Sequence, residues 1–337
     1  MTNYKSLSLL VAFLCMLLAS CTKEIPFDKN KEKPILIMNA VVDATQTSHD
    51  VFFALTDRNN PISVTGDISL TVSVNDKEIE TITAPTEKNK ITFSCVLKAG
   101  DKLRLQASDR QGHQVIAESI VPQAPKGVLT LRTEDYSWES NGNKKKGLKY
   151  FVDLDDPSEE LTYYRLNSEI KMSKYLTSDG IKDEMNYPRW INTILIVDDV
   201  ILSDGHPRSN PDSEDYDLMG TMDYDPNLMG IFNNKRFKNS ACTLSYVIST
   251  YEMQSNNYYT DFEPAYGYSI DYAATVDVQR ITAEAYKYFQ LLNKLKSDNY
   301  SEMINEPIEV PSNVTGGTGF VTCINGISAT NITTKPF

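Results

Sequence analysis

Histidine is scarce in this chain of 337 residues, and the scarcity limits the chemistry that we expect of it. The three histidines are His49, His113 and His206, which lie far apart and match no zinc-binding spacing. The sequence also lacks the Gly-x-Ser-x-Gly turn of serine hydrolases and the Walker phosphate-binding motif. We interpret each histidine as a surface or turn residue. We therefore expect a protein that is not an enzyme and needs no cofactor.

Positive charge is also in short supply. Lys and Arg number 33 against 45 Asp and Glu, which gives a net charge of −12. An acidic chain without a basic stripe repels the phosphate backbone, so we expect no nucleic-acid partner. Because Asp and Glu are numerous, neighbouring acids in the sequence are weak evidence for a catalytic pair of carboxylates. We interpret Asp155–Asp156 and Asp198–Asp199 as strand ends, and a glycosidase-like pair of carboxylates stays an alternative that nothing in the sequence singles out.

Cysteine is too rare for a disulfide-stapled fold. Of the five cysteines, Cys15 lies in the N-terminal apolar run and Cys21 lies three residues after its end, which leaves three in the remaining chain. Cys95 lies on the apolar side of an alternating segment, so we expect it to be buried. Whether Cys242 and Cys323 pair is left open by the sequence.

No apolar run is long enough to span a membrane as a helix. The run Leu7–Leu18 is about a dozen residues and fits the short core of a secretory signal. It ends in Leu18-Ala19-Ser20-Cys21, which resembles the bacterial lipobox. We therefore predict a signal peptide over residues 1–20 and acylation of Cys21, with palmitate-like chains that together hold the protein stably on a membrane. The alternative is an ordinary signal peptide with an incidental cysteine.

The predicted mature chain starts with a polar tether over residues 21–32. No aspartate directly follows Cys21, and we expect the outer membrane as the location, with the periplasmic and cell-surface faces both open. Cleavage removes one positive charge, Lys5, so the mature protein carries −13.

Residues 33–122 show the period-two alternation of half-buried strands. The segment Ile68–Val74 is the clearest case, with Ile, Leu and Val alternating with Ser and Thr. About seven such strands are separated by short turns, which is typical of a sandwich. We predict an immunoglobulin-like β-sandwich here. Pro122 and Pro125 then mark a boundary, because proline denies the backbone donors that a strand needs.

Residues 123–337 read as a second β-rich domain with longer loops and one clear helix. We predict that helix near residues 283–297. Thr282 can cap it and Glu284 lies in its first turn, where the helix dipole favours an acid. An apolar stripe along it, from Ala285 to Leu295, indicates core packing. The double glycine Gly316-Gly317 indicates a close docking of the last strand rather than a phosphate loop.

Two local features of the second domain raise binding hypotheses. Asp223, Asp225 and Asn227 have the alternate spacing of calcium ligands, although the glycine and closing glutamate of an EF-hand are missing. A solvated loop is the competing interpretation. Tyrosines also cluster between Tyr246 and Tyr272, which suits either a sugar- or peptide-binding surface or ordinary strand faces.

Four stretches taken together resemble a family of Bacteroidota lipoproteins catalogued as domain of unknown function 4249. They are Cys21 with Pro34–Val42, Ala99–Leu105 with Gly112 and Val121–Pro122, Asp155–Leu166, and Ile281–Tyr288 with Glu306–Gly317. The last block is the most specific, because its order, spacing and double glycine all agree. The resemblance implies an envelope lipoprotein, often encoded beside a TonB-dependent outer-membrane transporter, and implies no known catalytic residues.

Three functions follow as hypotheses. The first is a non-enzymatic outer-membrane lipoprotein that serves as an accessory or ligand-binding partner of a TonB-dependent transporter. The second is an envelope hydrolase that uses carboxylates. The third is a surface adhesin or fimbria-like structural lipoprotein.

Overall fold

The structure is a computed structural model of the chain. It describes residues 34–56, 61–62, 64, 66–85, 89–140, 142–178, 181–184, 189–191, 195–196, 198–206, 227–249, 268–296 and 310–336. The predicted signal peptide, the predicted acylation site Cys21, the predicted tether 21–32, and the calcium candidates Asp223 and Asp225 lie outside these residues. None of the described helices has the length and apolar character needed to cross a membrane.

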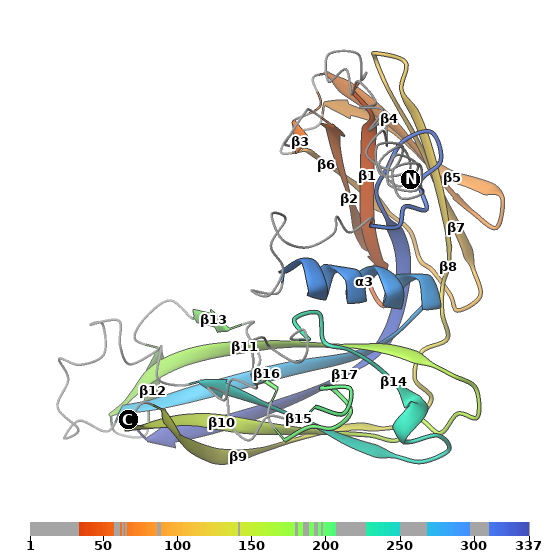
Figure 1. Ribbon diagram of the computed structural model, residues 1–337. Helices are drawn as coiled ribbons and strands as arrows, with labels where there is room; N and C mark the ends of the chain where they lie inside the picture. The colour runs from red at the N-terminus through yellow and green to blue at the C-terminus, as the bar shows by residue number, and fades with distance from the viewer. Residues whose placement is uncertain are drawn as a thin grey trace, which may run out of the picture.

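The described residues form two β-sandwich lobes set at a steep angle to each other, with a helix in the corner between them (Figure 1). The protein is mainly β, as the sequence predicts. The first lobe holds β1 to β8, and the second holds β9 to β16 together with most of β17.

The first lobe is built from strands whose alternate residues point into one core. The strands of this lobe are β1 (Leu36–Asp43), β2 (Ser48–Thr56), β3 (Pro61–Ile62), β4 (Asp67–Val74), β5 (Lys77–Pro85), β6 (Lys90–Ser94), β7 (Lys102–Asp109) and β8 (Gln114–Ile120). One layer contains β1, β2, β3 and β6, and the other has the order β5-β4-β7-β8. Leu36, Met38, Phe53 and Phe93 are among the buried residues of the core. Cys95 is buried here, which confirms its predicted position.

The second lobe pairs a three-stranded sheet, β15-β10-β9, with the part of the large sheet that contains β11, β16 and β17. The strands of this lobe are β9 (Leu129–Ser140), β10 (Asn143–Leu154), β11 (Tyr163–Ser178), β12 (Ile181–Glu184), β13 (Arg189–Ile191), β14 (Ile231–Asn233), β15 (Cys242–Ser249), β16 (Tyr268–Ile281) and β17 (Val321–Pro336). Three tyrosines, Tyr150, Tyr164 and Tyr246, are fully buried between the layers.

The last strand belongs to both lobes. Residues Val321–Ile324 of β17 pair in parallel with Ala40–Asp43 of β1, and the rest of β17 pairs antiparallel with β16. The predicted division assigns all of this segment to the second domain, whereas residues 310–324 lie on the first lobe. The strand continues to Pro336.

The double glycine lies where the C-terminal segment inserts between β1 and β8. A Cβ atom on Gly317 would overlap the carbonyl oxygen of Leu36 and the side chain of Val115. Thr315 forms two backbone hydrogen bonds with Ile116 on the other side. The predicted docking role of Gly316-Gly317 is therefore confirmed.

Helix α3 (Ala283–Lys296) fills the corner between the lobes and confirms the predicted helix. The Thr282 hydroxyl accepts a hydrogen bond from the Ala285 amide at 3.1 Å, as a cap does. Ala285 and Phe289 of the helix are buried with Ile281 of the second lobe and with Phe320 and Ile324 of the C-terminal segment. This apolar cluster joins the two lobes.

Two sequence interpretations are wrong. His49 is buried on the inner face of β2 rather than at the surface, because its position continues the inward alternation of Val51 and Phe53. Asp199 is buried in a turn and accepts hydrogen bonds from the amides of Ile201, Leu202 and Ser245. Asp156 is likewise buried, in an ion pair described below. Asp155 and Asp156 directly follow the end of β10, as the sequence predicts, whereas Asp199 lies in a turn.

Candidate ligand-binding site

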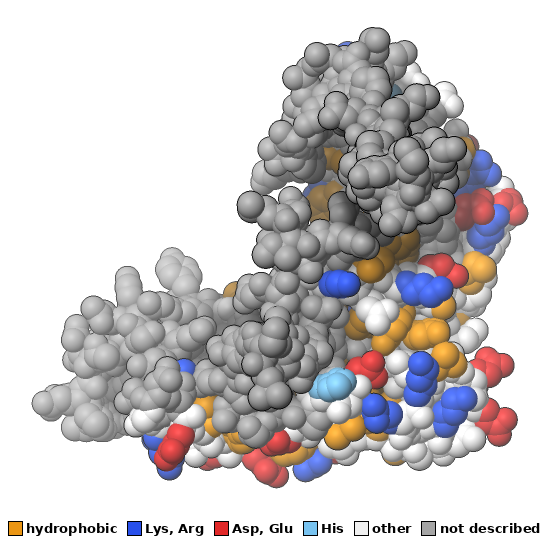
Figure 2. Space-filling view, in the orientation of Figure 1, with side chains coloured by type: hydrophobic (Ala, Val, Ile, Leu, Met, Phe, Trp, Pro, Cys, Tyr) orange, Lys and Arg blue, Asp and Glu red, His pale blue; other side chains and the backbone are white. Residues whose placement is uncertain are grey.

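A pocket of about 450 Å³ opens in the angle between the lobes. One wall is the outer face of β1 and β2 in the first lobe, and the other is formed by Tyr288 of α3 with Phe320 of the C-terminal segment. Hydrophobic side chains gather on the surface where the two lobes meet (Figure 2).

The strand wall owes its composition to the alternation of β1 and β2. Since the inward residues of both strands fill the core, the residues between them point outward into the angle. Asn39 and Phe52 are directly opposite each other across the two strands. Phe52 is 50% exposed, which is high for a large apolar side chain, and Asn39 places its amide on the neighbouring strand.

The aromatic wall is held in a fixed position. The rings of Tyr288 and Phe320 stack with centroids 4.1 Å apart and an interplanar angle of 5°. The Phe320 amide donates a hydrogen bond of 2.8 Å to Asn39 Oδ1, which ties the aromatic wall to the strand wall. The pocket is thus assembled by three separate parts of the chain.

Two carboxylates line the pocket and differ in their partners. Asp50 accepts hydrogen bonds from Thr92 Oγ1 at 2.6 Å and Lys90 Nζ at 2.9 Å. The Thr92 hydrogen bond, followed by that of Lys90, lowers the pKa of Asp50. Asp43 Oδ1 accepts from the amide and the hydroxyl of Thr45, and no lysine or arginine among the described residues pairs with it.

The histidine of the pocket is engaged in the sheet. His49 Nε2 lies 3.2 Å from the carbonyl oxygen of Cys95, and its ring lies beside that of Phe93 with centroids 5.1 Å apart. Since a carbonyl can only accept, Nε2 is the donor in this contact. The ring therefore fixes the end of β2 beside the segment that follows β6.

The remaining histidines and the calcium candidates do not join this pocket. His113 contacts Asp109 Oδ2 at 2.6 Å, and His206 ends an exposed turn. Asn227 uses its side chain to close a turn, with Oδ1 accepting from the Ile231 amide and Asn293 Nδ2. Within the described part of the chain, no group of three or more His, Cys, Asp and Glu is placed to hold a metal ion.

The other predicted features are also distributed through the fold. Of the tyrosine cluster, Tyr246 and Tyr272 are core residues, while Tyr251, Tyr258, Tyr259 and Tyr266 lie outside the described residues. Cys242 and Cys323 are free thiols in different cores, so they do not pair in this structure.

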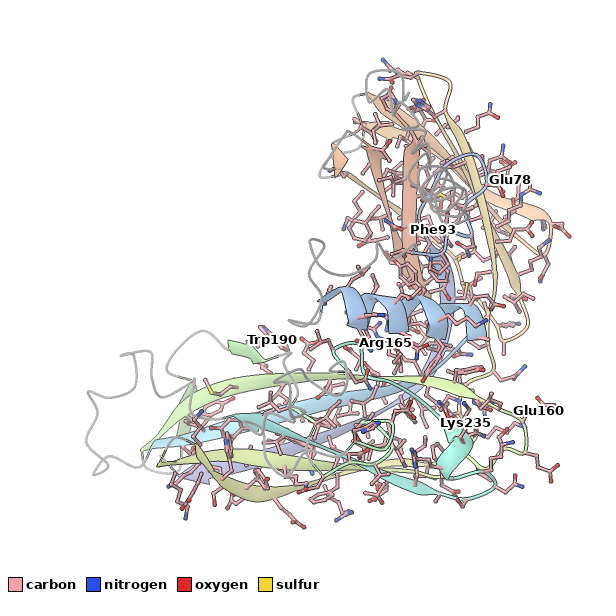
Figure 3. The ribbon with its side chains drawn as sticks, viewed as in Figure 1. Glu78, Phe93, Glu160, Arg165, Trp190 and Lys235 are labelled. Carbon is pink, nitrogen blue, oxygen red and sulfur yellow. The ribbon has the colours of Figure 1, made fainter. Side chains whose placement is uncertain are left out.

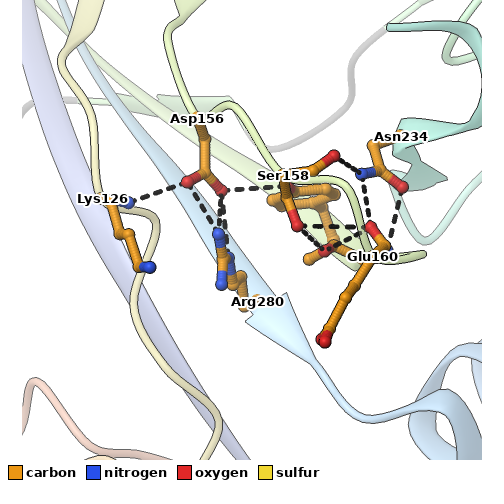
Figure 4. Close-up of polar contacts among 8 residues, drawn as sticks. Lys126, Asp156, Ser158, Glu160, Asn234 and Arg280 are labelled. Atoms are coloured by element: carbon orange, nitrogen blue, oxygen red, sulfur yellow. Dashed lines mark hydrogen bonds and ion pairs between the residues drawn. The ribbon is translucent and has the colours of Figure 1, made fainter. Parts of the chain in front are cut away.

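A buried ion pair fixes the connection between the lobes (Figure 4). Asp156 accepts hydrogen bonds from Nε and Nη2 of Arg280, with contacts between 2.7 and 3.0 Å. It also accepts from the Tyr164 hydroxyl and from the backbone amide of Lys126 in the linker, both at 2.9 Å. All its contacts are internal, so this cluster holds the linker and does not offer a site.

A second arginine lies beneath the helix. Arg165 of β11 reaches toward α3 (Figure 3), where its guanidinium lies 5.1 Å from the centre of the Phe289 ring. Its Nε donates to the Met229 carbonyl at 3.3 Å, and burial lowers its pKa. Arg165 therefore supports the helix that carries Tyr288.

Comparison with known proteins places the chain in a family. The family model described as "Domain of unknown function (DUF4249)" matches residues 22–328. The chain belongs to the DUF4249 family. No match is found among the curated proteins.

Solved structures resemble this DUF4249 protein only distantly. A central fibronectin-III array of RIM-binding protein is 12% identical over 49% of this chain and 54% of that one, with a TM-score of 0.19. A carbohydrate-binding module from the β-sandwich superfamily is a second match. It is 14% identical over 64% of this chain and 96% of that one, also with a TM-score of 0.19.

The residues that form the pocket of this DUF4249 protein were not among the sequence candidates. Phe52 gave one usable signal, since it is a large apolar residue at an outward position of an alternating strand. Tyr288 and Phe320 gave none, because their stacking depends on how the C-terminal segment returns to the first lobe.

Proposed function

We propose that this protein is a non-enzymatic lipoprotein of a Bacteroidota outer membrane, anchored through acylated Cys21, which binds a small ligand in the corner pocket as the accessory partner of a TonB-dependent transporter. The observation that carries the binding role is the pocket itself. It combines an exposed aromatic ring, a fixed aromatic stack and carboxylates held by hydrogen bonds. Preformed pockets with a few placed polar groups are the usual form of small-molecule sites.

The anchor and the partner rest on the sequence. The lipobox Leu18-Ala19-Ser20-Cys21 supports acylation, and the resemblance of the four sequence stretches supports a transporter encoded nearby. A membrane-bound protein that presents a pocket near a transporter raises the local concentration of ligand at its entrance.

The test of this function is affinity purification of the tagged protein from detergent-solubilised native outer membranes, with mass spectrometry of what co-purifies. We expect a TonB-dependent transporter in stoichiometric amount. The matched control is Cys21→Ser, which removes the acylated thiol and should release the protein from the membrane fraction. Recovery of the anchored protein alone would count against the transporter partnership.

The hydrolase alternative has one supporting observation, which is that Asp43 and Asp50 line the same pocket. Carboxylate hydrolysis needs one acid that holds a proton near neutral pH. The lowered pKa of Asp50 keeps that group ionised, so it suits binding better than proton donation. Turnover of a glycan or peptide pool that disappears in both Asp43→Asn and Asp50→Asn would favour the hydrolase.

A further inference from the structure

We propose that the corner pocket selects ligands that carry a primary ammonium group, and that Asp43 is the residue that binds it. This inference rests on the proposed ligand-binding function and adds the chemical class of the ligand. A free peptide amino terminus and an amino sugar both present this group.

The first argument is charge. Among the described residues, those that line the pocket include two acids, Asp43 and Asp50, and no lysine or arginine. Lys90 forms an ion pair with Asp50 and offsets its charge. Asp43 has no such cation among the described residues, so it leaves a net negative charge at the pocket wall. A ligand cation is attracted to that charge, and a ligand anion is repelled.

The second argument is the balance of donors and acceptors. An ammonium group offers three donors and no acceptor. Beside Asp43, the buried Gln279 directs Nε2 toward Asp43 Oδ2 at 3.5 Å, a weak contact. The Oε1 atom of Gln279 has no hydrogen-bond partner in the described structure, although the residue is only 6% exposed. Because Asp43 Oδ2 receives only the long contact from Gln279 Nε2 among the described residues, it keeps acceptor capacity for a donor on a ligand.

The third argument is the aromatic neighbour. The exposed Phe52 ring lines the same pocket and can pack against the apolar part of a ligand or against a cation. A ligand that joins an ammonium group to an apolar or ring portion therefore matches both features.

The experiment is isothermal titration calorimetry of the full-length protein in detergent at low salt. Three pairs of probes are used: phenethylamine and 2-phenylethanol, the dipeptide Phe-Ala and its N-acetyl form, and glucosamine and N-acetylglucosamine. We expect at least one free amine to bind at least tenfold more tightly than its neutral counterpart. The pair that shows the preference distinguishes a peptide source from a sugar source.

The variants assign the effect to a residue. Asp43→Asn keeps an oxygen that can accept from Thr45 and removes the charge, so it should weaken the amine tenfold or more and leave the neutral probe unchanged. Asp153→Asn is the matched control and should leave amine binding unchanged, because it removes the same charge from β10 of the second lobe, outside the pocket. Asp50→Asn should weaken amine binding less than Asp43→Asn does, because Lys90 already offsets the charge of Asp50. If Asp43→Asn fails to fold, the salt dependence of the unaltered protein replaces it, with amine binding weakening between 20 mM and 500 mM NaCl.

Other outcomes overturn the inference. Equal binding of amines and neutral probes, lost in Phe52→Ala, would leave a ligand site in place and reject the ammonium preference. A larger loss in Asp50→Asn than in Asp43→Asn would reject the assignment to Asp43. Absence of binding for all six probes would reject the amine class, while the membrane purification decides the transporter partnership independently.

Discussion

At the scale of single residues, we expect the largest loss of stability from substitutions in the ion pair between Asp156 and Arg280. Asp156 is 1% exposed and its carboxylate holds the linker amide of Lys126 as well as the Tyr164 hydroxyl. Removing one charge of a buried pair leaves the other uncompensated, which costs more than the pair contributes to begin with.

We predict that Asp156→Asn lowers the free energy of unfolding by about 3–5 kcal/mol, because Arg280 stays buried without its counter-ion. The matched control is Asp153→Asn, which breaks a solvent-exposed pair with Arg132 and should cost about 1 kcal/mol or less. Urea denaturation of both variants measures the difference. Equal effects would show that the buried pair is not special.

The buried thiols give a second prediction at this scale. Burial raises the pKa of Cys242 and of Cys323 to about 12, and it also raises the pKa of Cys95. Since the thiolate is the reactive form, a shift from ~8.5 to about 12 reduces the thiolate fraction at pH 8 roughly a thousandfold. In a protein that starts at Thr22, and so lacks Cys15 and Cys21, Ellman's reagent should react with three thiols only after unfolding. Rapid reaction of a native thiol would contradict the structure.

The same shifts set a pH dependence of stability. A raised folded pKa favours the neutral thiol in the native state, so its contribution is complete below the unfolded pKa of ~8.5. The free energy of unfolding should therefore fall as the pH rises from ~8.5 toward 12. Cys242→Ala should make this fall less steep in alkaline denaturation curves. An unchanged slope would show that the thiol does not contribute.

At the scale of elements, alternation and capping were enough to predict most strands and the helix. The alternation of Ile68–Val74 gave β4, and Thr282 with Glu284 gave the start of α3. These signals are local, and burial enforces them. What the sequence could not show was the pairing of Val321–Ile324 with β1, because a contact between residues nearly 300 positions apart leaves no local pattern.

The docking of the C-terminal segment supplies the prediction at this scale. Gly317→Ala introduces a Cβ against backbone as well as side-chain atoms, and overpacking of this kind costs about 1–3 kcal/mol. The control is Gly112→Asn, at a turn with positive φ and open space, where Asn is tolerated. Thermal unfolding of the two variants should show the larger loss for Gly317→Ala. A smaller loss there would mean that the segment docks less closely than the structure has it.

At the scale of the whole molecule, the pocket is a product of how the two lobes are joined. Tyr288 comes from the helix, Phe320 from the C-terminal segment, and Asn39 and Phe52 from the first lobe. Of these residues only Phe52 gives a signal in the sequence, and the other parts of the pocket come from distant segments, which is why the candidate site could not be found from the sequence while the β class could. The linker connects the two lobes along the chain, whereas β17 and the apolar cluster around Phe289 fix how the lobes are placed relative to each other.

This arrangement predicts that a cut in the linker leaves the molecule intact. A thrombin site inserted between Gln123 and Ala124 allows the chain to be cleaved between the lobes without touching Lys126, whose amide holds Asp156. The fragment before the cut contains β1, and the fragment after it contains β17, which pairs with β1 and shares the apolar cluster. The two fragments should co-elute in gel filtration after cleavage and separate in guanidinium chloride.

Combining the cut with Gly317→Ala should weaken the association, because the clash lies in the segment that joins the fragments. Separation of the unaltered fragments under native conditions would show that the lobes are held together by the linker alone, and that the pocket between them is not a fixed feature of the protein.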